Sequence, residues 1–269
     1  MKEIIQSNTN KTIKYIKALQ LKKYRDEYGK FIIEGEKLLK EALDYKASIS
    51  MVLFSESFAE SERYGELEAA LKSSNIPLYY SDERVFKEVG ETETPQGVIA
   101  IVDKMEFNLD SILKKDELCI VLLDEVRDPG NAGTIIRTAD ACGIDAVLLS
   151  NGSVDLYNGK TIRATMGSLF HIPVIQNLDT TEAILKLKDS SVMTIGADPH
   201  SSESCIDLPR YKRSAIIIGN ESQGIGREII ELLDKNIKIP MPGRAESLNA
   251  GIAASILMYE FSIRKRYAK

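Results

Sequence analysis

The segment 239–249, Ile-Pro-Met-Pro-Gly-Arg-Ala-Glu-Ser-Leu-Asn, places polar side chains in a rigid stretch directly before an apolar helix. Pro240 and Pro242 fix φ and supply no N–H, and Ser247 and Asn249 lie where a helix start leaves N–H donors unpaired. Residues 250–254, Ala-Gly-Ile-Ala-Ala, have little side-chain bulk, so another backbone or a flat ligand can approach closely. The pattern predicts a binding loop.

A second polar loop spans residues 124–133 and leads into a helix that carries Arg137. Pro129-Gly130 is typical of a turn, and Asn131 is a good helix N-cap. Arg137 then lies nearly two turns along the helix. Spacing alone favours an ordinary capped turn followed by a surface arginine.

The glycine-bracketed segment 219–226, Gly-Asn-Glu-Ser-Gln-Gly-Ile-Gly, raises two nucleotide-binding possibilities, and both fail. A P-loop needs Lys-Ser or Lys-Thr after Gly224, and a dinucleotide fingerprint needs a glycine where Ile229 stands. What remains is a flexible loop that presents Glu221. Its carboxylate either orients a substrate or a neighbouring loop, or it serves as a dipole partner for the next helix, and both interpretations stay open.

Composition narrows the class of protein that these loops belong to. The chain has 269 residues, 43% of them hydrophobic and 28% charged, with a net charge of −5, which is typical of a globular protein of about two domains. We find no apolar N-terminal run and no uncharged 18-residue stretch, so we expect no signal peptide, no membrane span and a cytoplasmic location. Three separated cysteines and two histidines disfavour disulfides and a metal site.

Short apolar strands must position these loops. In the first hundred residues they are expected at 31–33, 50–54, 78–80 and 97–102, with helices near 36–44, 61–73 and 82–89. A second series follows at 118–123, 146–149, 173–175, 192–195, 215–218 and 237–239, with helices near 132–142, 158–168, 180–188 and 226–233. Because the later strands are apolar on both faces, we predict a parallel sheet with ligands beyond its carboxyl ends.

The polar segment after residue 103 sets the predicted domain limits. We assign 1–104 to a small α/β domain, 105–117 to a linker and 118–269 to a second α/β domain. Residues 1–30 carry Lys2, Lys11, Lys14, Lys17, Lys22, Lys23, Arg25 and Lys30, interleaved with Tyr15, Tyr24 and Tyr28. Such a basic, aromatic first helix either binds RNA or is a solvated face whose tyrosines belong to the core, and both remain open.

Three motifs follow one another along the chain: Asn131 with Arg137, Gly219-Asn220-Glu221, and the segment 239–249. Together they resemble the sequence motifs of the SpoU (TrmH-like) branch of the SPOUT RNA methyltransferases. The segments 31–35 and 93–97 look similar to the RNA-binding domain that precedes the catalytic domain in many members, a domain of the L7Ae ribosomal-protein type. The resemblance therefore covers most of the chain.

This resemblance implies an α/β fold whose C-terminal parallel-sheet SPOUT domain carries a trefoil knot, and a homodimer that buries the last helix. It implies methyl transfer from S-adenosylmethionine to a ribose 2′-hydroxyl of RNA, without a metal. We expect 23S ribosomal RNA as substrate, with transfer RNA as the alternative. By the same resemblance, the catalytic residues are Asn131, Arg137, Glu221, Ser247 and Asn249, and the cofactor-binding residues are Thr194, Gly196, Gly219, Ile239, Met241 and Leu248.

The role of Arg137 is where the resemblance and physical chemistry differ. Such arginines are proposed as general bases, yet a guanidinium with a pKa above about 12 almost never loses its proton. We expect Arg137 to bind phosphate and to stabilise the developing alkoxide. Two other classes of function stay as alternatives: a non-catalytic RNA-binding dimer, and a nucleotide-dependent oxidoreductase or NTPase, which the failed glycine-rich fingerprints disfavour.

Overall fold

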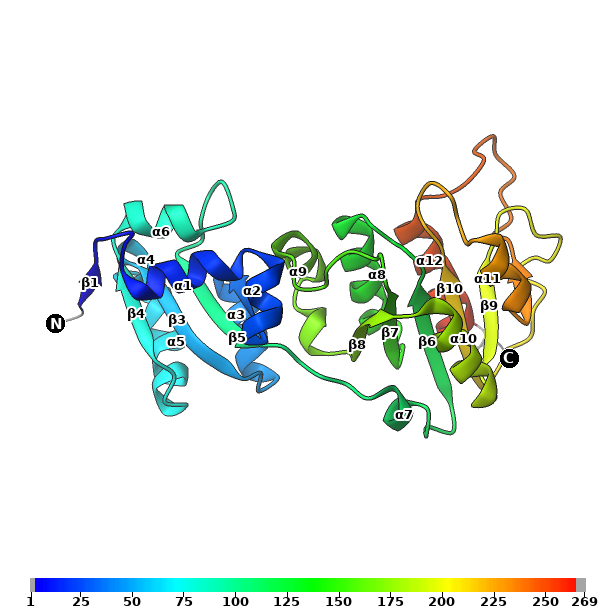
Figure 1. Cartoon of the computed structure of the whole chain (residues 1–269), viewed down its shortest axis with the longest axis horizontal. Coiled ribbons are helices and arrows are strands. Elements are labelled where there is room, and N and C mark those ends of the chain that lie inside the picture. The colour runs from blue at the N-terminus through cyan, green and yellow to red at the C-terminus, as the bar shows by residue number, and fades with distance from the viewer. Residues whose placement is uncertain (1–2, 265–269) are drawn as a thin grey trace. The chain divides into compact units, whose positions relative to one another are not determined.

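The computed structural model describes residues 3–264, and these residues form two compact units (Figure 1). The first unit contains the chain up to Met105 together with the segment Tyr157–Phe170. The second contains Glu106–Leu156 and the chain from His171 onward. Lys2, one of the basic residues noted above, lies outside the described residues.

The first unit is built on a mixed sheet with the strand order β1-β4-β3-β5-β2. These strands span Ile4–Ile5, Leu78–Ser81, Ile49–Ser55, Val98–Asp103 and Lys30–Glu34. β4 runs parallel to β1 and β3, whereas β5 runs antiparallel to β2 and β3. The four strands predicted in this part of the chain are confirmed as β2, β3, β4 and β5.

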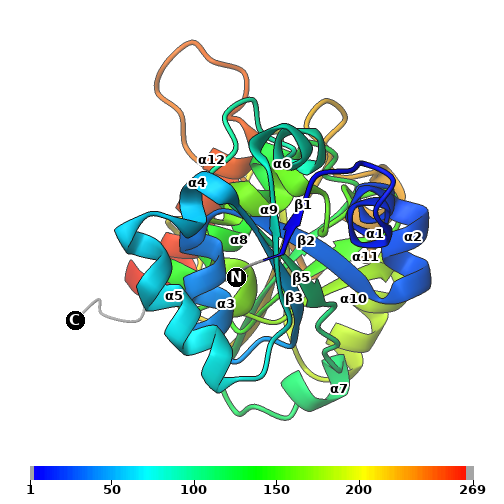
Figure 2. The ribbon, with the colours of Figure 1, turned by 90° about the vertical axis from the view of Figure 1, so that its left-hand side faces the viewer.

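Helices cover both faces of the first sheet. Figure 2 shows α1 (Lys11–Leu19) and α2 (Lys22–Tyr28) on one side, and α3 (Glu36–Asp44) and α5 (Glu62–Ser73) on the other. α6 (Glu83–Val89) shares a buried apolar cluster with α1, and α4 (Glu56–Ala59) contacts β3. The prediction of a single basic first helix is wrong, because that helix breaks at Gln20 and Leu21.

The segment 157–170 packs within the first unit, although it lies far along the chain. It forms α9 (Gly159–Thr165) and a short 3-10 turn. Phe31 on β2 lies 4.5 Å from the ring of Tyr157 and 6.5 Å from that of Phe170, measured between ring centroids. The sequence had placed this segment inside the second domain, 118–269, and those domain limits stay a prediction.

The second unit is built on a sheet with the strand order β11-β9-β10-β6-β7-β8, in which each neighbouring pair of described strands runs parallel. In chain order, the strands span Leu118–Leu123 (β6), Ala146–Ser150 (β7), Val174–Leu178 (β8), Met193–Ala197 (β9), Arg213–Ile218 (β10) and Lys235–Ile237 (β11). The predicted parallel sheet is confirmed. The central strands β6, β7 and most of β10 are apolar runs because both faces of the sheet are buried there.

The helices of the second unit are α7 (Leu109–Ile112), α8 (Pro129–Ala141), α10 (Thr180–Asp189), α11 (Arg227–Leu232) and α12 (Ala250–Met258), which continues into a π-helical turn. α7 lies within the predicted linker, yet its Leu109 and Ile112 join the core of this unit. The linker is therefore anchored by its own apolar residues.

The start of α8 differs from the prediction. Asp128, not Asn131, is its N-cap: the Asp128 carboxylate accepts a hydrogen bond of 2.7 Å from the Asn131 N–H, and Pro129 occupies the first helical turn. The prediction of a turn at Pro129-Gly130 capped by Asn131 is therefore wrong. Proline suits the first helical position, where its missing N–H is not needed.

Candidate active site

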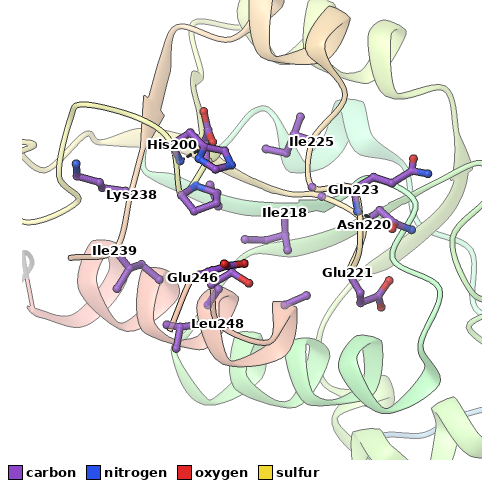
Figure 3. A pocket seen from close by; sticks show the side chains of 18 of the residues that line it. His200, Ile218, Asn220, Glu221, Gln223, Ile225, Lys238, Ile239, Glu246 and Leu248 are labelled. Carbon is purple, nitrogen blue, oxygen red and sulfur yellow. Dashed lines mark hydrogen bonds between the residues drawn. The ribbon is translucent and has the colours of Figure 1, made fainter. Parts of the chain in front are cut away.

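A pocket of about 400 Å³ opens beyond the carboxyl ends of β9, β10 and β11 (Figure 3). Its apolar wall contains Ile218, Ile225, Ile237, Ile239 and Leu248. Its polar rim contains Asp198, His200, Glu221, Lys238, Glu246 and Ser247. The pocket lies where parallel sheets bind ligands, because strand ends there leave backbone groups and loops free.

The loop after β10 is a braced turn. Asn220 and Gly224 exchange backbone hydrogen bonds of 3.0 and 2.9 Å, and Gly224 has a φ of 69° that favours glycine. A methyl group on Gly219 would lie 2.2 Å from the carbonyl carbon of Gly224, so only glycine fits there. The amide of Asn220 donates to the Glu125 carbonyl oxygen at 2.9 Å and ties this turn to the loop after β6.

Three of the predicted catalytic residues form one chain of hydrogen bonds. The Asn131 Nδ2 donates to Glu221 Oε1 at 3.1 Å, and the Asn131 Oδ1 accepts from Asn249 Nδ2 at 2.9 Å. Asn249 is also the N-cap of α12, since its Oδ1 accepts from the Ile252 N–H at 3.2 Å. This Asn131–Glu221–Asn249 network links the loops after β6, β10 and β11.

Glu221 is held as a carboxylate by these contacts. Its two oxygens accept the backbone N–H groups of Asp128 at 2.9 Å and Arg127 at 3.2 Å, as well as the Asn131 amide. Partial burial raises the pKa of Glu221, but these hydrogen bonds outweigh it, and the pKa lies below its usual value. Glu221 therefore binds the backbone of the loop after β6, and a part in orienting the substrate stays a prediction.

The small residues of α12 allow this arrangement. A methyl group on Gly251 would lie 3.4 Å from the Asn131 Oδ1 and 3.6 Å from the Asn131 Cα, so α12 approaches α8 closely. One turn further along, Thr138 Oγ1 on α8 lies 3.1 Å from Ser255 Oγ on α12. The close approach expected from residues 250–254 is confirmed.

The other two predicted catalytic residues do not join the network. Ser247 lines the pocket but is exposed and makes no hydrogen bond with residues 3–264. Arg137 is exposed on α8, and its guanidinium has no hydrogen bond or ion pair with the described part of the chain. A charged group without an internal partner is free to bind an external anion.

The predicted cofactor residues divide into two groups. Gly219, Ile239, Met241 and Leu248 line the pocket. Thr194 and Gly196 do not: Thr194 is fully buried within β9, where its Oγ1 donates to Asp234 Oδ2 at 2.7 Å. Gly196 lies behind the pocket wall, and a methyl group there would come within 2.6 Å of the Leu233 side chain. In this structure both residues support the strand below the pocket.

Several residues of the polar rim are not among those predicted from the sequence. Asp198 and His200 follow β9, Lys238 follows β11, and Glu246 belongs to the loop before α12. In Figure 3, His200 and Glu246 lie on opposite sides of the cavity. Their position after the strands was the available signal, but the predicted β9 ended two residues too early for Asp198 to stand out.

The pocket suits a ligand with a flat apolar part and a zwitterionic part. Branched aliphatic side chains supply the apolar wall, and the glycine turn exposes backbone groups at close range. Lys238 and Glu246 offer one charge of each sign. These features fit S-adenosylmethionine, which has an adenine ring and a charged amino-acid end.

Two further observations bear on the site. No group of three or more His, Cys, Asp or Glu side chains within residues 3–264 is arranged to hold a metal ion. None of the helices in this range is long and apolar enough to cross a membrane. His171 pairs with Asp140 at 2.8 Å, away from the pocket, and Cys119 and Cys142 are free thiols.

Known proteins are similar to this chain in sequence and in fold. The chain is 38% identical over 255 residues to the 23S rRNA (guanosine(2553)-2'-O)-methyltransferase RlmP of Bacillus subtilis (strain 168), covering 95% of this chain and 97% of that protein. It is 29% identical over 249 residues to the 23S rRNA (uridine(2479)-2'-O)-methyltransferase of Streptomyces viridochromogenes, covering 90% and 85%. The crystal structure of the AdoMet-bound rRNA methyltransferase from Sinorhizobium meliloti superimposes with a TM-score of 0.87 at 31% identity, covering 99% of both chains.

Family models match both units. The model of the MRM3-like substrate binding domain matches residues 10–100. The model of the SpoU rRNA Methylase family matches residues 118–259, which include the whole Asn131–Glu221–Asn249 network. The resemblance inferred from the three motifs is confirmed, and the chain belongs to the SpoU rRNA methylase family.

Proposed function

We propose that this protein transfers a methyl group from S-adenosylmethionine to a ribose 2′-hydroxyl of 23S ribosomal RNA in the cytoplasm. The observation that carries the proposal is the Asn131–Glu221–Asn249 network beside a pocket that fits the cofactor. The names of the relatives from Bacillus subtilis and Streptomyces viridochromogenes support the reaction and the RNA class.

Some residues around the pocket bind the cofactor, and others position the loops for the reaction. Bound S-adenosylmethionine supplies an electrophilic methyl group on a sulfonium. The turn at Gly219 and the wall containing Ile239 and Leu248 hold the cofactor. The network fixes the three loops around the reacting atoms, so little reorganisation is needed during the reaction.

Arg137 is the group that we assign to the ribose. Its exposed guanidinium has no partner within residues 3–264, so it binds an RNA phosphate and stabilises negative charge that develops on the 2′-oxygen. Ser247 lies at the pocket rim with a hydroxyl available to the same ribose.

The proposal includes a homodimer that buries α12. Ile252, Ile256 and Tyr259 are spaced along one side of this helix, with 51%, 38% and 56% of their surface exposed. Such an apolar stripe is typical of a surface covered by a partner. Ile256→Glu should therefore yield a monomer in analytical ultracentrifugation, whereas the exposed Leu185→Glu on α10 should leave the mass unchanged. A dimeric Ile256→Glu variant would contradict this interface.

We also propose that the C-terminal segment forms the trefoil knot of the family. β11 lies at one edge of the sheet, whereas α12 contacts α8 and β10. The chain must therefore turn back across the strand ends through residues 238–249. This return path supports the threading that the resemblance implies.

Calorimetry and methyl transfer test the proposal. S-adenosylhomocysteine should give a measurable heat of binding, and tritiated S-adenosylmethionine should label 23S ribosomal RNA from a strain that lacks the gene. The modified nucleotide should resist alkaline cleavage, because its 2′-oxygen is methylated. An absence of binding heat at high protein concentration would exclude the enzyme, and label confined to transfer RNA would establish the alternative substrate.

A further inference from the structure

The helices α1 and α2 present a cluster of tyrosines at the surface of the first unit. The ring of Tyr28 meets that of Tyr15 edge-on, with 5.4 Å between centroids, and stacks with Tyr24 at 6.1 Å and an interplanar angle of 14°. Tyr28 has 43% of its surface exposed. The cluster therefore ends in a pre-oriented aromatic ring that solvent can reach.

The core of the unit does not explain this cluster. The buried side of α1 consists of Ile13, Ile16 and Leu19, which pack against α6 and the sheet. The buried residue of α2 is Arg25, which donates hydrogen bonds to the backbone carbonyls of Leu19 and Gln20 at the end of α1. Only Tyr15 of the three tyrosines packs against the core, so the interpretation that these rings are core residues is wrong for Tyr28.

Four lysines of α1 and α2 have no ion-pair partner among residues 3–264, and one of them, Lys23, lies with its Nζ 5.6 Å from the ring centroid of Tyr24. Other basic residues nearby form ion pairs: Lys17 with Glu88, Lys30 with Asp103 and Lys104 with Asp26. By contrast, no carboxylate of residues 3–264 lies within salt-bridge distance of Lys11, Lys14, Lys22 or Lys23. Unpaired positive charge beside an exposed aromatic ring matches the two parts of a nucleotide, its phosphate and its base.

We propose that this Tyr–Lys face of α1 and α2 binds a single-stranded segment of the RNA substrate. A base stacks on Tyr28, and Lys11, Lys14, Lys22 and Lys23 contact the phosphates that flank it. The occupant is single-stranded because a base inside a duplex is stacked on its neighbours and cannot offer its face to a ring. The inference rests on the proposed function, since it assigns part of the RNA contact to this face.

Stacking is tested with a fluorescent single-stranded oligouridine of twelve nucleotides and with a duplex of the same length. Tyr28→Ala should weaken binding of the single strand by about 5- to 150-fold, the range expected for one stacked base. Tyr28→Phe keeps the ring and should bind like the unchanged protein. Tyr79→Ala removes an exposed tyrosine from β4 and is the matched control. Unchanged affinity of Tyr28→Ala, or an equal loss for the duplex, would overturn the stacking.

The lysine contacts are tested by the salt dependence of binding. Replacing Lys11, Lys14, Lys22 and Lys23 by glutamine should lower the slope of log affinity against log salt by about 3, because each phosphate contact to a single strand contributes about 0.7. Lys72→Gln on α5, on the other side of the sheet, should leave the slope unchanged. An unchanged slope in the fourfold variant would overturn the assignment.

Kinetics separate this inference from the proposed function. With ribosomal RNA as substrate, both the Tyr28→Ala and the fourfold lysine variants should raise KM while kcat and the affinity for S-adenosylhomocysteine stay unchanged. If the unchanged protein binds no S-adenosylhomocysteine, the proposed function fails, whereas the oligouridine measurement still reports on the Tyr–Lys face. If it methylates RNA and the variants keep its KM, this inference alone fails.

Discussion

Asn131→Asp tests whether the hydrogen-bond network holds the site together. In the native chain the Asn131 Nδ2 donates to Glu221 Oε1 across 3.1 Å, while the Oδ1 accepts from Asn249. The substitution keeps the acceptor for Asn249 but turns the donor into a carboxylate oxygen. Two like charges then face each other across the same distance.

The magnitude follows from that distance. Two unit charges 3.1 Å apart repel by about 1.3 kcal/mol in water and by about 5 kcal/mol at an effective dielectric constant of 20. Asn131 is buried and Glu221 is exposed, so an intermediate value of about 2–3 kcal/mol applies. The lost hydrogen bond adds about 1 kcal/mol. We expect Asn131→Asp to lower the free energy of unfolding by about 3 kcal/mol and to abolish most methyl transfer.

Urea unfolding and single-turnover methyl transfer measure the two effects. Adding Glu221→Gln to Asn131→Asp reverses the hydrogen bond and should restore about half of the lost stability, because the new amide cannot accept the Asp128 N–H as well. Thr134→Asp places the same charge on the exposed side of α8 and should change stability by less than about 0.5 kcal/mol. A double variant no better than Asn131→Asp alone, or an Asn131→Asp variant as stable as Thr134→Asp, would refute the reasoning.

The pH dependence of the Asn131→Asp variant has a defined sign. Two facing carboxylates raise the pKa of the pair above its value in the unfolded chain. The destabilisation is therefore present at high pH and decreases as pH falls through the raised pKa. The difference in free energy of unfolding between this variant and the unchanged protein should be smaller at acidic than at neutral pH.

Three further substitutions probe separate parts of the site. Arg137→Ala should lower kcat/KM for methyl transfer at least about 100-fold and leave the affinity for S-adenosylhomocysteine within about twofold, and equal loss of both would contradict its role. Gly219→Ala should weaken binding of that ligand more than about tenfold, because the added methyl group would lie 2.2 Å from loop backbone. Gly243→Ala, with no atom within 4 Å of its methyl group, should bind normally, so similar calorimetric titrations for both variants would argue against a tight turn. Asp234→Asn should lower stability at neutral pH by about 1–2 kcal/mol, because the carboxylate accepts the Thr194 N–H and Oγ1–H at 2.9 and 2.7 Å. Burial raises the pKa of Asp234, but these hydrogen bonds outweigh it and place the pKa below its usual value. The stabilisation by this carboxylate is therefore present above the pKa of the unfolded chain and is lost as pH falls through the pKa of the folded protein. The free energies of unfolding of the native protein and of Asp234→Asn, measured in urea, should therefore converge in acid. A difference that widens in acid would contradict this account.

The central strands of the second unit were predictable because β6, β7 and most of β10 are apolar runs. The predicted strand 118–123 coincides with β6, and the bounds of the others lie within three residues of those of β7 to β11. Their parallel arrangement followed from burial of both faces. The three loops of the site could then be placed at one edge of the sheet before the structure was known.

Finer features of the site depend on contacts that spacing does not encode. Asn131 was mistaken for the N-cap because Pro129 was interpreted as part of a turn, whereas Asp128 caps the helix and Asn131 turns inward to Glu221. Thr194 and Gly196 lie within β9, whose carboxyl end extends to Ala197, and Ala197 pairs with Ile237 on β11. Only that pairing shows that the pocket, which Ala197 lines, begins at the end of β9.

The sequence also could not predict that the segment 157–170 packs within the first unit. It follows β7 in the chain and has ordinary helical composition, so nothing local distinguishes it from the helices of the second unit. Its membership in the first unit comes from ring contacts of Tyr157 and Phe170 with Phe31. Aromatic residues distant in sequence pair in ways that periodicity cannot reveal.

The Asn131–Glu221–Asn249 network also bears on when the enzyme becomes active. Glu221 and Asn249 follow Asn131 by 90 and 118 positions along the chain. During translation, Asn131 therefore leaves the ribosome long before its partners are made, and parallel sheets with such distant contacts form slowly. An unfinished chain lacks the linked loops, so we expect methylation to begin only after synthesis has passed α12.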